Sequence, residues 1–132
     1  MENVESLGEE LREPRPVLVV DDDELISSAV EFILVDEGYP VMVARNGQEA
    51  LECAEKRHPS VILLDMKMPV MDGWAFAATY RARPGPHAPI IVMTAAHDSR
   101  HRAAEISAEG YISKPFDLDH LLDLVSHYAS HG

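Results

Sequence analysis

Four short apolar runs in this chain each end in a residue able to take part in chemistry. The runs and the residues that follow them are 17–20 with Asp21, Asp22 and Asp23, 61–64 with Asp65, 90–93 with Thr94, and 110–113 with Lys114. Short, β-branched apolar runs are typical of strands buried on both faces of a parallel sheet. Because the carboxyl ends of parallel strands meet at one edge, we expect these acidic, hydroxyl and basic side chains to form one site. Such a group suits Mg²⁺ and a phosphoryl group.

The segments between the runs carry apolar residues at helical spacing. Asn46 and Asp117 are expected to cap two of the helices, and a further strand is expected at 39–44. The apolar helical positions are Ile26, Ala29, Val30 and Ile33; Ala50, Leu51 and Ala54; Trp74, Ala77, Ala78 and Tyr80; and Leu118, Leu121, Leu122 and Val125. Another helix is expected within about 97–107. Five strand–helix repeats with right-handed crossovers predict a three-layer α/β sandwich around a central parallel sheet.

The length and charge of the chain limit the number of domains and the kinds of partner that it can have. With 132 residues, 46% of them hydrophobic, the chain has room for one folded domain, expected at 15–132 after a mobile acidic leader at 1–14. The net charge of −12 argues against nucleic-acid and anionic-membrane partners. A single cysteine, Cys53, excludes an internal disulfide, and the chain shows neither a membrane-spanning apolar stretch nor a signal peptide. We therefore expect a cytoplasmic protein.

Over residues 16–130 the chain resembles a response-regulator receiver domain, the phospho-accepting module of two-component signalling. The resemblance rests on four motifs in this order: Val-Leu-Val-Val-Asp-Asp-Asp, Leu-Leu-Asp-Met-Lys-Met-Pro-Val-Met-Asp-Gly, Val-Met-Thr-Ala and Gly-Tyr-Ile-Ser-Lys-Pro-Phe. Each motif is weak alone, but all four at successive strand ends are specific. The family fold is flavodoxin-like, which implies a five-stranded parallel sheet in the order 2-1-3-4-5.

The resemblance implies that Asp65 is the phosphoryl acceptor. It implies a Mg²⁺ site, which Mn²⁺ could also occupy, formed by Asp22 directly, Asp21 through water, Asp65 and the backbone carbonyl of Lys67. A carboxylate can accept a phosphoryl group only once its own charge is offset, and a divalent cation supplies that offset. Without a cation, three crowded carboxylates repel one another, so the site should bind metal readily.

The remaining roles also follow from the resemblance. Thr94 and the amide of Ala95 would hydrogen-bond the phosphoryl group, and Lys114 would pair with it electrostatically. Tyr111 would turn inward with Thr94 on activation, and the peptide bond between Lys114 and Pro115 would be cis. The switched surface would comprise the fourth predicted helix, the fifth strand and the fifth helix.

The implied partners are a sensor histidine kinase or a histidine phosphotransfer protein, which donates from a phosphohistidine, and a downstream target protein. A weak homodimer is compatible with this reading. The domain would be an acceptor and switch rather than an enzyme, with intrinsic autodephosphorylation as its one self-catalysed step.

The chain departs from the family pattern at two places. The span from Thr94 to Lys114 is slightly shorter than usual, which predicts a shortened or displaced fourth helix. The side chains at Lys67 and Ala96 occupy the positions that flank the path of the hydrolytic water in the family, so they are expected to tune the phosphoryl lifetime.

Other functions share part of the pattern. A haloacid-dehalogenase-like phosphatase would use Asp21 and Asp23 with Thr94 and Lys114, but its further acidic strand end should follow the lysine, whereas Asp65 precedes Thr94. A flavin-binding protein would need a loop rich in Ser, Thr and Gly after the first strand, where three aspartates would repel phosphate. A receiver that only docks to partners would not need the full set of reactive residues.

Three minor features have ordinary interpretations. The histidine pairs 97/101 and 127/131 stand at i,i+4 spacing, which can bind a metal, but no third ligand accompanies them. We therefore interpret them as surface residues. Cys53 is interpreted as a small buried apolar residue of the second helix, and Asp72 with Gly73 as the turn that opens the third.

Overall fold

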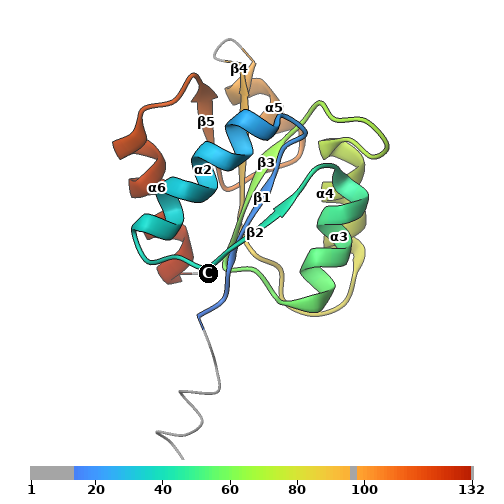
Figure 1. Cartoon of the computed structure of the whole chain (residues 1–132). Helices are drawn as coiled ribbons and strands as arrows, with labels where there is room; N and C mark the ends of the chain where they lie inside the picture. The colour runs from blue at the N-terminus through green and yellow to red at the C-terminus, as the bar shows by residue number, and fades with distance from the viewer. Residues whose placement is uncertain (1–13, 96–97, 132) are drawn as a thin grey trace, which may run out of the picture.

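The computed structural model describes residues 14–95 and 98–131, so the predicted leader lies outside the described residues apart from Pro14. Strands and helices alternate along the chain (Figure 1). In order they are β1 (Val17–Val20), α2 (Glu24–Asp36), β2 (Val41–Ala44), α3 (Gly47–Lys56), β3 (Val61–Asp65), α4 (Gly73–Ala82), β4 (Ile90–Ala95), α5 (Ser99–Glu105), β5 (Gly110–Lys114) and α6 (Leu118–His131). None of the helices in these ranges is long and apolar enough to span a bilayer.

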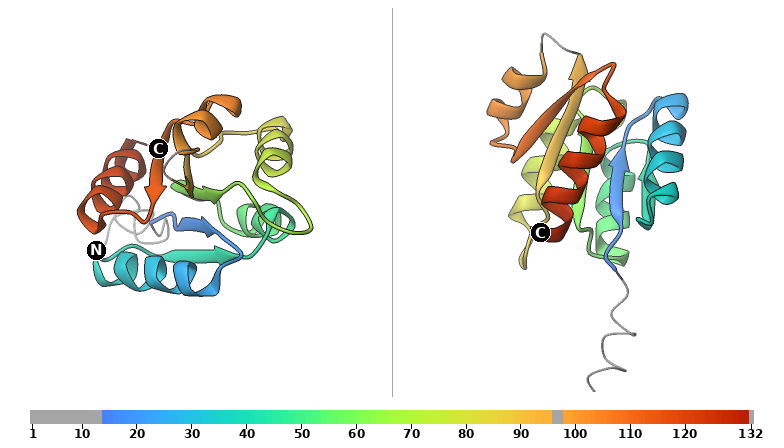
Figure 2. Two further views of the ribbon diagram at one scale, coloured as in Figure 1. Left: turned by 90° about the horizontal axis from the view of Figure 1, so that it is seen from above. Right: turned by 90° about the vertical axis from the view of Figure 1, so that its left-hand side faces the viewer.

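The five strands form one parallel sheet in the order β2-β1-β3-β4-β5, which confirms the predicted fold class. Helices α2 and α6 cover one face of the sheet, and α3, α4 and α5 cover the other (Figure 2). The three layers follow from the crossovers, because each helix must return the chain to the starting edge of the sheet before the next parallel strand begins.

Successive residues of the central strands belong to opposite halves of the core. In β1, Val17 and Val19 pack with α2 and α6, whereas Leu18 and Val20 pack on the side of α3 and α4. All four are fully buried. This double burial explains why the central strands read as unbroken apolar runs rather than as alternating ones.

The helices match the predicted segments, but some of their buried residues differ from the predicted ones. In α4, Phe76 is fully buried although it was not among the predicted positions, while Ala78 is exposed. Phe76, Ala77 and Tyr80 lie on one side of a helix with 3.6 residues per turn, and Ala78 falls on the other. In α2 the fully buried apolar residues are Val30 and Leu34, and Ala29 is exposed.

The predicted caps are present. Asn46 Oδ1 accepts a hydrogen bond from the Glu49 amide at 2.9 Å, and Glu49 Oε1 accepts one at 2.9 Å from the amide of Arg45, the residue before the cap. Asp117 Oδ1 accepts from the Asp119 amide at 2.9 Å. Helix α5 has seven residues, in line with the shortened helix that the short span predicted.

Candidate functional site

The carboxyl ends of β1 and β3 bring together the acidic residues that the sequence singled out. One carboxylate oxygen from each of Asp21, Asp22 and Asp65 lies within 4.8 Å of the others. The pairing of Val20 with Leu64 in the parallel register places the residues that follow them side by side. Asp21 and Asp65 are buried, and Asp22 is exposed, so the cluster opens to solvent on one side. Three carboxylate oxygens this close are a donor set that suits Mg²⁺.

Asp23 takes no part in this cluster. Its Oδ1 accepts hydrogen bonds from the amides of Leu25 and Ile26, at 3.0 and 3.3 Å, and so caps the amino terminus of α2. Its own amide donates to Asp21 Oδ1 at 2.9 Å, which orients the Asp21 carboxylate. The Asp21–Asp23 pair of the phosphatase alternative is therefore divided between a site residue and a helix cap.

Lys114 reaches the cluster from the end of β5, although β3 and β4 separate β5 from β1 in the sheet. Its Nζ lies 2.8 Å from Asp21 Oδ2 and 4.0 Å from Asp65 Oδ2. The long lysine side chain spans the intervening strand ends and holds its ammonium between the two buried carboxylates. The peptide bond from Lys114 to Pro115 is cis, as the resemblance implied.

Thr94 lies at the end of β4, between β3 and β5 in the sheet, and is buried. The register pairs it with Ser113 and pairs Ala95 with Lys114. Tyr111, the predicted reporter, is 41% exposed on β5 and so points outward in this structure. Ala96 lies outside the described residues.

Burial raises the pKa of Asp65 to about 6, from an ordinary value of 3.8. The Lys114 ammonium and the Lys67 amide, which donates to Asp65 Oδ1 at 3.4 Å, oppose this rise, whereas Asp21 and Asp22 add to it. Lys114 places one ammonium beside three clustered carboxylates, and such an excess of negative charge favours the binding of a divalent cation.

Gly73 is a site residue that the sequence interpretation treated only as part of a turn. Its amide donates to the Met66 carbonyl at 2.9 Å and closes the loop that follows Asp65. A Cβ at this position would lie 2.6 Å from Met66 Sδ and 3.0 Å from the Asp65 carbonyl oxygen. Only glycine permits this approach, so Gly73 sets where the loop leaves the acceptor. The Asp-Gly pair before a helix was the only indication of this role in the sequence, and such a pair does not predict the close contact of Gly73 with Met66 and the Asp65 carbonyl oxygen.

An apolar hollow of about 530 Å³ adjoins the acidic cluster. Its lining residues are Leu25, Ile26, Ala29, Ala95, Lys114, Pro115 and Phe116. Leu25 is 83% exposed, and Phe32 further along α2 is 74% exposed. Large apolar side chains left in water next to a polar site are typical of a surface that another protein covers.

The minor features behave largely as interpreted. Within 14–95 and 98–131, the three aspartates are the only group of three or more His, Cys, Asp or Glu residues close enough to share a metal ion. His101 is exposed and lies 3.4 Å from Glu105, and His127 packs against the Tyr128 ring. His97 lies outside the described residues. Cys53 is partly buried, and that burial raises the pKa of its thiol.

Comparisons with known proteins agree with the resemblance to receiver domains. The family model for the response regulator receiver domain matches residues 17–126. The chain is 38% identical over 118 residues to the DNA-binding transcriptional regulator NtrC of Escherichia coli K12, which covers 87% of this chain and 25% of NtrC. It is 36% identical over 115 residues to the transcriptional regulatory protein PdtaR of Mycobacterium tuberculosis H37Rv, which covers 85% of this chain and 55% of PdtaR. The chain therefore spans between a quarter and just over half of these relatives.

A solved structure shows the same fold. The receiver domain of the sensor histidine kinase PA1611 from Pseudomonas aeruginosa PAO1, described with a magnesium ion coordinated in its active site cleft, matches with a TM-score of 0.79. The match is 28% identical in sequence and covers 88% of this chain and 98% of that one.

Proposed function

The chain belongs to the response regulator receiver domains, and we propose that within it Asp65 accepts the phosphoryl group from the phosphohistidine of a partner kinase or phosphotransfer protein. Receiver domains of this family serve two-component signalling as phosphoryl acceptors. The observation that carries the assignment to Asp65 is its position: it is buried at the end of the central strand β3, with Lys114, Asp21 and Asp22 around it.

The arrangement supports transfer by positioning and electrostatics. An Asp65 carboxylate oxygen would attack phosphorus while the bond from phosphorus to the histidine nitrogen breaks, and the histidine nitrogen keeps that electron pair. Lys114 would then offset charge on the phosphoryl oxygens, for which its Nζ already lies 4.0 Å from Asp65 Oδ2. Thr94 and the amide of Ala95 stand at the adjacent strand end as hydrogen-bond donors.

We assign the metal site to Asp21, Asp22, Asp65 and the backbone carbonyl of Lys67. The cluster supports this assignment, since three carboxylates lie close together and one ammonium, that of Lys114, lies beside them. When bound there, Mg²⁺ would neutralise the acceptor and the incoming phosphoryl oxygens. Mn²⁺, with similar oxygen preferences, would serve in its place.

Output would be a population shift at the surface formed by α5, β5 and α6. Thr94 is buried and Tyr111 is outward in this structure, so movement of Thr94 towards a phosphoryl group would leave space for the Tyr111 ring. Driving such an equilibrium from mostly off to mostly on needs about 5 kcal/mol. A few charge-assisted hydrogen bonds to the new dianion supply energy of that order.

The donor protein would contact the apolar hollow beside the site. Leu25 and Phe32 are exposed on the same helix, and the hollow adjoins Lys114, so a partner seated there would place its phosphohistidine near Asp65. The downstream target would bind the α5–β5–α6 surface. A weak homodimer through that surface is also compatible with the fold.

Phosphorylation with a small phosphodonor tests the assignment. We expect stoichiometric label on Asp65 in the presence of Mg²⁺, loss of the label on chelation, and no label in Asp65→Asn. Turnover of a generic phosphatase substrate by the unmodified chain would favour the phosphatase alternative.

Replacing Leu25 by alanine should slow transfer from a phosphohistidine donor while leaving labelling by the small donor unchanged, which separates docking from chemistry.

A further inference from the structure

The loop between the acceptor and α4 has a strained backbone. We define the acceptor loop as residues 66–72, which connect β3 to α4. The amide of Met71 donates to the Pro69 carbonyl at 2.7 Å, and Val70 between them has a φ of 70°, so these residues form a γ-turn. A β-branched residue is strained at positive φ, and such a conformation persists only where the surrounding structure holds it. The acceptor loop therefore needs an anchor outside itself.

Helix α3 provides that anchor through its first residue, Gly47. The Gly47 amide donates to the Met71 carbonyl at 2.8 Å. The first amides of a helix have no acceptor inside the helix, so this donor is available to the loop. A Cβ at position 47 would lie 2.6 Å from Met71 Cγ and 2.8 Å from the Met71 carbonyl oxygen. Glycine is therefore required for the loop to lie against the helix.

The start of α3 is fixed by contacts of its own. The Asn46 side chain accepts a hydrogen bond from the Glu49 amide and caps the helix. Gly47, Ala50 and Leu51 are buried. Figure 1 shows the acceptor loop passing this end of α3 before it enters α4. A loop bonded here is held to a rigid part of the domain.

The first residues of the acceptor loop lie beside the proposed metal site. The Lys67 amide donates to Asp65 Oδ1 at 3.4 Å, and the Lys67 carbonyl is the backbone ligand of that site. A backbone bond at Met66 holds the loop on one side of Lys67, and the bond at Met71 holds it on the other. Three residues separate Lys67 from Met71, and one of them, Pro69, has a fixed φ. A shift at Met71 is therefore passed on to Lys67.

We propose that Gly47 is a positioning residue for the metal site, an inference that rests on the proposed function. By bonding Met71, the Gly47 amide sets the acceptor loop so that the Lys67 carbonyl lies beside the acidic cluster. Gly47 would act through the loop rather than by touching the metal. Altering a group that orients metal ligands changes metal affinity by about 10–100-fold. Because Mg²⁺ demands near-ideal octahedral geometry and Ca²⁺ accepts irregular sites, a displaced carbonyl should weaken Mg²⁺ binding more than Ca²⁺ binding.

The test measures the affinity of the full chain for Mg²⁺ and for Ca²⁺ by titration calorimetry, well below the unfolding temperature. Gly47→Ala should weaken Mg²⁺ binding by about tenfold or more and Ca²⁺ binding by less than about threefold. A second variant carries an ester in place of the Gly47 amide. The ester removes the donor without adding a methyl group, so it tests the bond without the overlap, and it should weaken Mg²⁺ binding in the same way.

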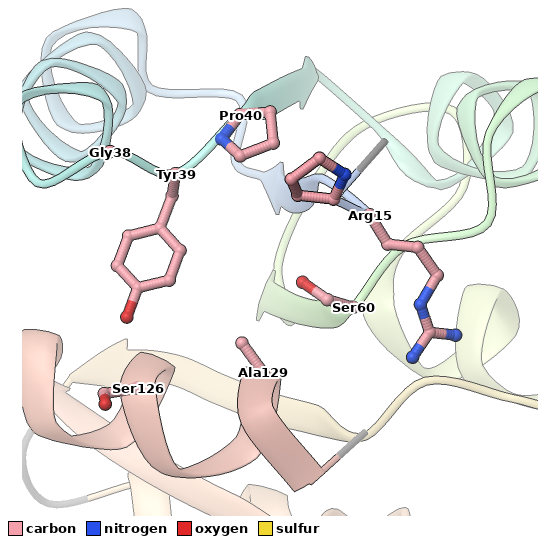
Figure 3. Close-up of a pocket in the computed structure, with 8 residues that line it drawn as sticks. Arg15, Gly38, Tyr39, Pro40, Ser60, Ser126 and Ala129 are labelled. Carbon is pink, nitrogen blue, oxygen red and sulfur yellow. The ribbon is translucent and has the colours of Figure 1, made fainter. Parts of the chain in front are cut away.

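Gly38→Ala provides the matched control. Gly38 has a φ of 94° and open space around it. It lies at the hollow of Tyr39, Ser60 and Ala129 (Figure 3), before β2 and so at the opposite end of the sheet from Asp65. Alanine there should lower the melting temperature, because a side chain is disfavoured at this φ, yet leave both metal affinities unchanged.

Unchanged Mg²⁺ affinity in both Gly47 variants would overturn the proposal. Equal losses for the two ions would overturn it as well, since they would indicate general damage to the site. Labelling of the unmodified chain tests the proposed function separately. If Asp65 took no label in the presence of Mg²⁺, the proposed function would fail and this inference with it, whereas unaltered affinities in the variants would remove the inference alone.

Discussion

Lys114 lies closer to Asp21 than to the acceptor: its Nζ is 2.8 Å from Asp21 Oδ2 and 4.0 Å from Asp65 Oδ2. Asp21 has no exposed side-chain area, so its carboxylate depends on this ammonium for compensation. In the resting site the lysine therefore stabilises the metal-binding acid, and it is free to lean towards Asp65 once a new anion appears there.

Lys114→Met should lower the free energy of unfolding by about 2–4 kcal/mol in the absence of metal, because it leaves the buried Asp21 carboxylate without its partner. Urea unfolding with and without Mg²⁺ measures this. Mg²⁺ should restore a large part of the loss, since it compensates the same carboxylate. Equal losses under both conditions would show that the lysine does not share this role with a metal.

Asp65→Asn should stabilise the metal-free protein at pH 8 and have a small effect near pH 4. Asp65 has a pKa of about 6 in the folded chain and an ordinary value of 3.8, so the folded state keeps its proton to higher pH than the unfolded state. The stabilisation that comes from keeping this proton is complete below pH 4 and is lost as the pH rises from about 4 to 6. Above that range the free energy of unfolding is lower by about 2–3 kcal/mol. Thermal unfolding of both proteins over this pH range would detect it, and a difference independent of pH would contradict it.

Gly73→Ala should slow phosphorylation as well as lower stability, by about 1–3 kcal/mol, because the added methyl group overlaps Met66 and crowds the Asp65 carbonyl oxygen. Gly85→Ala is a matched control: Gly85 has a φ of 101° and open space around it, so alanine costs stability there without touching the site. The labelling rate with a small phosphodonor distinguishes the two. Equal labelling rates would mean that the loop after Asp65 absorbs the methyl group.

Lys67→Ala should change the decay rate of the phosphorylated protein while leaving metal affinity nearly intact. The Lys67 side chain is exposed beside the acceptor, whereas its proposed contribution to the metal site is a backbone carbonyl that alanine retains. Loss of label over time gives the decay rate, and a metal titration gives the affinity. An unchanged decay rate would remove Lys67 from the path of the hydrolytic water.

Glu105→Ala should loosen α5 selectively. Glu105 Oε1 accepts a hydrogen bond from Trp74 Nε1 at 3.0 Å, and Arg102 lies over the Trp74 ring at 5.1 Å while also pairing with Glu105. Ala103 is the described residue of α5 that belongs to the buried core, and the contacts of Glu105 and Arg102 with Trp74 add a tie from α5 to α4. We expect faster amide hydrogen exchange across α5 and a red-shifted emission of Trp74, the only tryptophan. His101→Ala, which removes only an exposed contact to Glu105, should leave both unchanged.

The sequence was sufficient to predict the fold and the members of the acidic cluster. Asp21, Asp22 and Asp65 could be predicted as site residues because apolar runs end just before them. Parallel strands bring their carboxyl ends together whatever the details of packing. Asp23 could not be separated from Asp22 in this way, since an aspartate at a helix start can cap the helix or face the site. The hydrogen bonds to the amides of Leu25 and Ile26 decide between the two roles.

What the sequence could not predict depends on contacts between distant elements. Phe76 is buried in place of Ala78 because the side of α4 that carries Phe76, Ala77 and Tyr80 packs into the core. The pairing of Lys114 with Asp21 depends on how a flexible side chain crosses two strand ends. The raised pKa of Asp65 depends on its burial, which exists only in the folded chain.

Lys114 and Asp21 are 93 positions apart in the chain, and they meet only when the last strand has joined the sheet. A ribosome-bound or truncated polypeptide that ends before β5 would carry the acceptor without the ammonium beside it. Uptake of label should thus report that β5 has joined the sheet, and a chain cut between β4 and β5 should regain it only when the two fragments reassemble.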